Sequence, residues 1–80
     1  MPKAQHSFAY KMLPLLLRNM RESAGLTQRD LGKKLKKPQS WIYNCESANR
    51  RVDVTEFAFW CRSCDVDPVK AFADVLAKLR

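Results

Sequence analysis

The sequence predicts an all-α fold, a compact single domain of five short helices. Apolar residues recur at spacings of three and four along most of the chain, and turn-type residues separate these stretches. Hydrophobic residues make up 46% of the chain, with only two glycines and four prolines, which is typical of a folded protein. Eighty residues allow one modest core, so we expect any function to lie on a surface rather than in a cleft between domains.

The first helix is predicted from residue 13 to about residue 24. It ends at Gly25, because glycine commonly follows a helix, and Pro14 suits its first turn. Its apolar stripe consists of Leu13, Leu16, Leu17, Met20 and Ala24. Residues 1–12 are predicted to form an N-terminal arm or an extra turn, with Phe8 and Met12 as candidate anchors, and residues 13–80 to form the domain.

A second helix is predicted over residues 27–35. Thr27 offers a side-chain oxygen to the unpaired N–H groups of the first turn, and Asp30 lies at the positive end of the helix dipole. Leu31 and Leu35 form the predicted buried face. After a two-residue turn, Pro38 predicts the start of a third helix, because proline is favoured at the first helical position.

The third helix is predicted to end near Glu46, with Ile42 and Cys45 facing the core. Its opposite side carries polar groups that both donate and accept hydrogen bonds but have no net charge. These are Gln39, Ser40, Tyr43 and Asn44. Such a composition is unusual for a helix face that only contacts water.

Two further helices are predicted from cap signals. Asp53 and Glu56 have the spacing of a capping box, and Asp67 followed by Pro68 repeats a cap-then-proline signal. The apolar stripe of the fourth helix consists of Phe57, Trp60, Cys61 and Cys64, with Phe59 off the stripe. The apolar residues of the fifth helix are Val69, Phe72, Ala73, Leu76 and Leu79. We expect the core to close with these five helices.

Charge divides the chain into two parts. Residues 1–51 carry eleven Lys and Arg against three acids, a net charge of +8, whereas residues 52–80 carry four against five, a net charge of −1. This asymmetry indicates a polyanionic partner for the first part, either nucleic acid or an anionic membrane surface. A solvated basic face without a partner is the alternative. The sequence shows neither a membrane-spanning segment nor a signal peptide, so we expect a cytoplasmic protein.

Between Leu17 and Phe72 the chain resembles the lambda-repressor-like family, the XRE-like regulators of the Cro and phage-repressor type. The resemblance depends on four segments in family order, TQRDL, PQSWI, CES and RRVDVTEF. The matching residues are Arg21, Gly25, Leu26, Thr27, Gln28, Leu31, Leu35, Pro38, Gln39, Ser40, Ile42, Glu46, Ser47, Arg50, Arg51, Asp53, Glu56, Val66, Asp67 and Pro68. It implies a helix-turn-helix formed by the second and third helices.

The resemblance also implies that the third helix enters the major groove of double-stranded DNA. The expected base-reading residues are Gln39, Ser40, Tyr43 and Asn44, because amides and hydroxyls can pair with base edges. The expected contacts to the DNA backbone are Gln28, Lys33, Lys34, Lys36, Lys37, Pro38, Trp41, Arg50 and Arg51. For each set, an ordinary solvated surface is the alternative.

A structural role is expected for Arg21 and Glu46, which the family pattern pairs as an ion pair. Three positions where relatives usually have glycine after a helix hold Lys36, Ala48 and Asp65, so the resemblance implies left-handed backbone at unfavourable residues. Lys36 and Lys37 also replace the small and apolar pair that relatives usually have between the second and third helices, so the resemblance does not fix the angle of that turn.

The favoured hypothesis is a sequence-specific transcriptional regulator, a repressor of the phage or mobile-element kind that binds as a homodimer. The candidate dimer interface consists of Phe59, Phe72, Leu76 and Leu79. The alternative is an antitoxin-like module that binds a protein and also binds its own operator. That class would need a tail that wraps its partner, and the chain offers little material for one. Neither a toxin nor RNA polymerase is identified as a partner.

Catalytic and metal sites are not expected. Cys61 and Cys64 form a CxxC, with Cys45 and His6 as further candidate ligands, but both cysteines fall on the apolar stripe of the fourth helix, where buried free cysteine packs well. No Ser, Asp or Cys near His6 makes an arrangement for nucleophilic catalysis. We therefore expect no enzyme activity, no metal and no cofactor, with reduced thiols.

Overall fold

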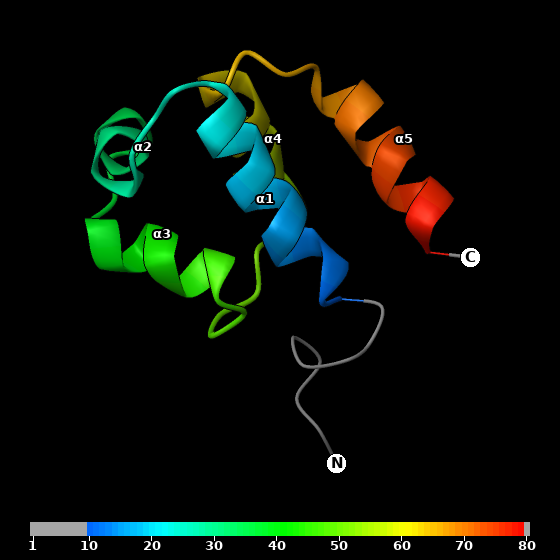
Figure 1. Cartoon of the computed structure of the whole chain (residues 1–80), viewed down its shortest axis with the longest axis horizontal. Coiled ribbons are helices and arrows are strands. Elements are labelled where there is room, and N and C mark those ends of the chain that lie inside the picture. The colour runs from blue at the N-terminus through cyan, green and yellow to red at the C-terminus, as the bar shows by residue number, and fades with distance from the viewer. Residues whose placement is uncertain (1–9, 80) are drawn as a thin grey trace.

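The computed structural model describes residues 10–79, and within this range the chain forms five helices and no strand, which confirms the all-α prediction. The helices are α1 (Met12–Ser23), α2 (Gln28–Leu35), α3 (Gln39–Glu46), α4 (Val54–Ser63) and α5 (Pro68–Lys78). Figure 1 shows α1 across the middle, with α2 and α3 on one side of it and α5 on the other. The region around α1 and α4 is therefore the centre of the fold.

Three of the helices begin at the predicted caps. The Thr27 hydroxyl accepts from the Asp30 N–H at 3.0 Å while the Asp30 carboxylate accepts from the Thr27 N–H, also at 3.0 Å. Asp53 and Glu56 form the same reciprocal box before α4, with both hydrogen bonds at 2.8 to 2.9 Å. Asp67 accepts from the Val69 N–H at the start of α5. Each cap satisfies N–H groups that the helix itself leaves unpaired.

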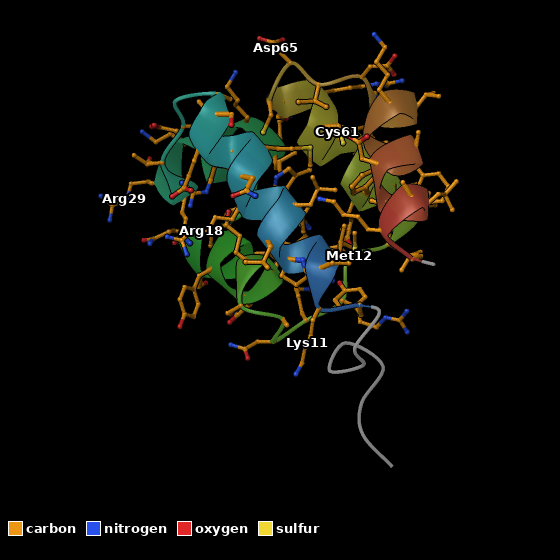
Figure 2. The ribbon with its side chains drawn as sticks, turned by 45° about the vertical axis from the view of Figure 1, so that its right-hand side comes forward. Lys11, Met12, Arg18, Arg29, Cys61 and Asp65 are labelled. Atoms are coloured by element: carbon orange, nitrogen blue, oxygen red, sulfur yellow. The ribbon has the colours of Figure 1, made fainter. Side chains whose placement is uncertain are left out.

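Two predicted starts differ from the structure by one residue. Pro38 is the N-cap of α3 rather than its first residue, because its ψ of 157° is extended and only Gln39 begins the helical backbone. Met12, assigned to the N-terminal segment, is the first residue of α1 and packs against the core. Tyr10 and Lys11 form a turn before it (Figure 2). The candidate anchor Phe8 lies outside the described residues, as does His6.

Left-handed backbone occurs at the three predicted positions. Lys36, Ala48 and Asp65 have φ values of 57°, 64° and 59°, which are less favourable for these residues than for glycine. Asp65 lies in the loop between α4 and α5 (Figure 2). The turn between α2 and α3 closes through the Lys37 N–H, which donates to the Gly32 carbonyl at 2.8 Å. A Cβ atom on Gly32 would meet the Lys37 carbonyl oxygen at 2.6 Å, so this tight turn requires glycine there.

The core draws its side chains from all five helices. Trp60 is at its centre, fully buried, with its indole N–H donating to the Leu17 carbonyl of α1 at 3.1 Å. The other core residues are Leu17, Met20, Leu31, Ile42, Cys45, Phe57, Cys61, Cys64, Ala71 and Val75. The predicted stripes of α1 to α4 supply most of this set.

The sequence listed the apolar residues of α5 without indicating which of its faces is buried. Ala71 and Val75 pack against the core, whereas the predicted apolar residues Val69, Phe72, Ala73, Leu76 and Leu79 are exposed. The small Ala71 and the medium-sized Val75 therefore form the contact of α5 with the core, and the large apolar residues of this helix face away from it.

All three cysteines are buried free thiols. Burial raises the pKa of Cys45 and of Cys61 to about 11, so both remain protonated at neutral pH. The Cys61 sulfur packs 3.8 Å from that of Met20. Within residues 10–79 no cluster of His, Cys, Asp or Glu could hold a metal ion. In the same range, no helix has the length and apolar character to cross a membrane.

Candidate nucleic-acid interface

One face of α3 is polar and open to solvent. Ile42 and Cys45 bury the opposite face of this helix, which leaves Gln39, Ser40 and Tyr43 exposed. These three side chains lie on one surface, as the sequence predicted from their spacing. They present amide and hydroxyl groups without net charge.

Asn44 lies at the margin of this face and is half-buried. Its side-chain oxygen accepts from the Asn49 amide at 3.3 Å, and its backbone carbonyl accepts from the Asn49 N–H at 2.9 Å. Asn44 is therefore partly committed to the loop after α3. Fewer of its polar groups are available to a ligand than those of Gln39 or Ser40.

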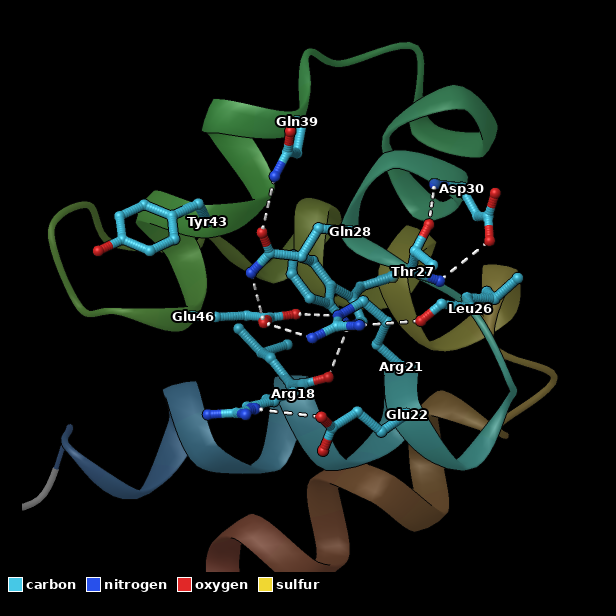
Figure 3. A network of polar contacts seen from close by, with 12 residues as sticks. Arg18, Arg21, Glu22, Leu26, Thr27, Gln28, Asp30, Gln39, Tyr43 and Glu46 are labelled. Atoms are coloured by element: carbon cyan, nitrogen blue, oxygen red, sulfur yellow. Dashed lines mark hydrogen bonds and ion pairs between the residues drawn. The ribbon is translucent and has the colours of Figure 1, made fainter.

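A chain of amide hydrogen bonds joins α2 to α3, as Figure 3 shows. The Gln39 amide donates to the Gln28 side-chain oxygen at 3.2 Å, and the Gln28 amide donates to Glu46 at 3.1 Å. This arrangement orients the Gln39 side chain. Its side-chain oxygen points away from Gln28, toward solvent. The sequence assigned both glutamines to an interface without indicating that they touch, because their contact spans two helices.

Glu46 ends this chain in an ion pair with Arg21 of α1 (Figure 3). The Arg21 guanidinium donates to both carboxylate oxygens, at 2.6 and 2.9 Å, and a third N–H donates to the Leu26 carbonyl at 2.9 Å. The two side chains are only 10% and 4% exposed. The hydrogen bonds to Glu46 raise the pKa of Arg21 further above its ordinary value. The predicted partners are therefore in contact, and they tie α1 to α3.

Two cations lie against the ring of Trp41, which is half-buried and packs on Trp60 with ring centroids 6.3 Å apart. The Lys37 ammonium is 5.2 Å from the Trp41 centroid, and the Arg50 guanidinium carbon is 4.8 Å from it. Arg50 also forms an ion pair with Glu56 at 3.1 Å. Trp41 thus holds two of the predicted backbone-contacting cations close to α3, and Glu56 partly neutralises one of them.

The remaining predicted cations lie on the surface of α2 and of the neighbouring loops. Lys33, Lys34 and Lys36 are exposed at the end of α2, and Arg51 is exposed in the loop after α3. Within the part of the chain that the structure describes, no carboxylate forms an ion pair with any of them. Their charge therefore remains available to an anionic partner.

Tyr10 contributes to this region although the sequence did not indicate it. Its hydroxyl accepts from the Val52 N–H at 2.8 Å, and the Arg51 guanidinium lies 5.5 Å from the centre of its ring. Burial raises the pKa of Tyr10 above its ordinary value. These contacts fix the loop that carries Arg51. No local pattern could have revealed them, because 42 residues separate the two hydrogen-bonded groups.

The candidate dimer residues fall into two separate places. Phe72, Leu76 and Leu79 are 50%, 53% and 46% exposed along one side of α5. Phe59 is also exposed, but it lines a hollow with residues of α2, whereas Phe72 lines a different hollow with residues of α1 and α4. The structure does not bring Phe59 together with the stripe on α5.

The arrangement of α2 and α3 defines the class of protein. A capped helix, a short turn closed onto Gly32 and a second helix with an exposed polar face make a helix-turn-helix, supported by the three other helices. The chain belongs to the helix-turn-helix domain family, whose model matches residues 14–79, and it is one of the XRE-like DNA-binding regulators.

Known structures support this assignment. An XRE-family like protein from Pseudomonas syringae pv. tomato str. DC3000 is 38% identical, with a TM-score of 0.83 over 90% of this chain and 88% of that protein. The restriction-modification controller protein C.Esp1396I, crystallised as a tetramer with its natural 35-base-pair operator, is 20% identical, with a TM-score of 0.79 over 92% and 97% of the two chains.

A third similar structure is that of the clp gene regulator ClgR from C. glutamicum. It is 16% identical, with a TM-score of 0.77, and the match covers 94% of this chain and 97% of that one. At this level of identity, the likeness to ClgR and to C.Esp1396I shows the shared fold alone. No curated protein matches the sequence significantly.

Proposed function

We propose that this protein is a sequence-specific transcriptional regulator that inserts α3 into the major groove of double-stranded DNA. The observation that carries the proposal is the exposed, uncharged polar face of α3, bordered by cations that have no carboxylate partner among the described residues. Base edges are read by neutral donors and acceptors, and phosphates attract the surrounding charge.

Base reading is assigned to Gln39, Ser40 and Tyr43, with Asn44 in a lesser role because of its bonds to Asn49. Gln39 is the strongest candidate, since Gln28 already holds its amide in one orientation. A side chain that is oriented before binding loses less conformational entropy when it pairs with a base.

Phosphate binding is assigned chiefly to Lys33, Lys37 and Arg51. Lys33 is exposed on α2, Lys37 is positioned by Trp41, and Arg51 is positioned by the ring of Tyr10. Arg50 contributes less, because Glu56 already neutralises part of its charge. Contacts of this kind set affinity and its dependence on salt rather than sequence preference.

The regulator is proposed to act as a repressor and to bind as a homodimer through α5. Phe72, Leu76 and Leu79 form an apolar stripe that the single chain leaves about half exposed. The assembly of C.Esp1396I as a tetramer on its operator supports an oligomer, since one helix-turn-helix reads only a few base pairs.

The test is selection of bound duplexes from a random pool, followed by binding of the selected and a scrambled duplex. Gln39→Ala should lose roughly 1–3 kcal/mol on the selected duplex and little on the scrambled one, because only base contacts discriminate. Lys33→Ala should weaken both equally and reduce the salt dependence, while Lys78→Ala at the end of α5 serves as the matched control. Recovery of no preferred sequence would contradict the proposal.

A further inference from the structure

A second surface feature lies on the side of the molecule formed by α2 and α4, and the DNA-binding assignment gives no role to the exposed Phe59 or to Arg62, which line it. An open hollow of about 620 Å³ separates the end of α2 from the last turns of α4. Phe59, which is 57% exposed, and Leu35 supply its apolar surface. The other lining residues are Lys34, Lys36, Arg62 and Ser63.

The charge of this hollow is entirely positive. Lys34, Lys36 and Arg62 contribute three cations, and no carboxylate is among the lining residues. The ion pairs found within residues 10–79 involve other arginines, so these three cations have no acidic partner in that range. An aromatic ring surrounded by unpaired cations is a surface complementary to an apolar group flanked by anions.

The hollow shares Lys34 and Lys36 with the expected DNA-backbone contacts, but it lies apart from the base-reading face of α3 and from the stripe on α5. It shares no lining residue with the pocket beside Gln28 and Gln39, nor with the hollow that contains Phe72. A ligand held against Phe59 would therefore not touch the polar face of α3 or the apolar stripe of α5.

We propose that this hollow docks an acidic segment of a partner protein. The segment would insert one apolar side chain against Phe59 and Leu35 and place its Asp or Glu carboxylates on Lys34, Lys36 and Arg62. Flexible carboxylate side chains can reach three separate cations around an apolar centre. The phosphates of a DNA duplex lie on a rigid convex surface that has no apolar group to insert.

Single-stranded nucleic acid is disfavoured for a related reason. Proteins that bind it stack successive bases on several aromatic rings along a basic groove. Here Phe59 is the single ring that lines the hollow, and its apolar neighbour Leu35 is aliphatic. The chemistry of the hollow therefore fits one buried apolar side chain better than a row of bases.

The probe is a fluorescent 12-residue peptide of Asp and Glu with a central Leu-Trp pair, whose binding to the full chain is measured by anisotropy. Control peptides replace the pair by Ser-Ser, or the acids by Lys. Phe59→Ala and Arg62→Glu should each weaken binding about ten-fold or more, as expected for central contacts of an interface. Leu15→Ala, at an apolar residue of α1 that is 63% exposed, and Lys70→Glu, with the same charge change as Arg62→Glu, are the matched controls and should alter it less than two-fold.

The outcome separates the proposal from simple charge attraction and from DNA binding. Equal losses for Arg62→Glu and Lys70→Glu, equal binding of the Ser-Ser peptide, or no detectable binding would each overturn it. Competition by single-stranded DNA that depends on Phe59 would also overturn it, because the hollow would then be a nucleic-acid site. Phe59→Ala should retain the duplex affinity of the wild type, so the result does not depend on the proposed function.

Discussion

The ion pair between Arg21 and Glu46 provides the sharpest test of how the helix-turn-helix is held to the rest of the fold. Glu46→Ala removes a carboxylate that accepts two hydrogen bonds from Arg21 and one from Gln28. The Arg21 side chain is only 10% exposed, so its charge would be left uncompensated in a nearly dry site. Breaking such a pair costs roughly 3–5 kcal/mol.

That loss is large compared with the expected stability of the whole domain. At about 0.05–0.15 kcal/mol per residue, a chain of this length has roughly 4–12 kcal/mol in total. With an m-value near 1 kcal/mol per molar urea, the unfolding midpoint of Glu46→Ala should fall by about 3 M or more. Urea denaturation followed by circular dichroism measures the midpoint and the slope together.

Two controls separate the buried pair from ordinary surface charge. Glu22→Ala breaks the ion pair with Arg18, whose side chains are more than half exposed, and should change stability by less than about 0.5 kcal/mol. The double substitution Arg21→Met with Glu46→Leu should recover most of the loss, because no unpaired charge remains buried. A loss below about 1 kcal/mol for Glu46→Ala would refute the reasoning.

Three further predictions concern the backbone, the oligomer and pH. Lys36→Gly should stabilise the fold by about 0.5–1 kcal/mol in thermal unfolding, because glycine adopts the φ of 57° at this position more readily than lysine does. A destabilised variant would contradict the claim that the backbone is strained at Lys36. Leu76→Asp should weaken dimers in sedimentation and Lys78→Asp should not; a wild type that is monomeric on a two-half-site duplex refutes the dimer. Because burial raises the pKa of Cys45 and Cys61 from 9.0 to about 11, the unfolded chain loses these protons first, and the free energy of unfolding should fall between pH 9 and 11. Cys45→Ala should lose less of its free energy of unfolding over this range than the wild type does. An equal loss in the two proteins would contradict the prediction.

Much of the helical structure could be predicted because its signals are local. Thr27 with Asp30, and Asp53 with Glu56, form capping boxes through atoms only three residues apart. Lys36 adopts the left-handed backbone at the position where the family pattern places glycine. These features depend on neighbouring residues in the chain, so the order of the letters is sufficient to indicate them.

The candidate site was predicted less completely. The sequence indicated that Gln28 and Gln39 belong to one interface, but their mutual hydrogen bond appears only when α2 and α3 are in place. It treated Arg50 as an available cation, whereas Glu56 and the Trp41 ring already engage it. Contacts between side chains on different elements depend on distances that no spacing along the chain encodes.

The sequence by itself determined that the chain folds into five helices, where most of them begin, and which face of α3 is polar. Only the tertiary structure decided that Ala71 rather than Phe72 faces the core, and that Phe59 lies apart from the stripe on α5. Periodicity shows that a helix has an apolar face, but the helix buries whichever face the remaining space accommodates. In α5 that face carries Ala71 and Val75, while Phe72, Leu76 and Leu79 stay about half exposed.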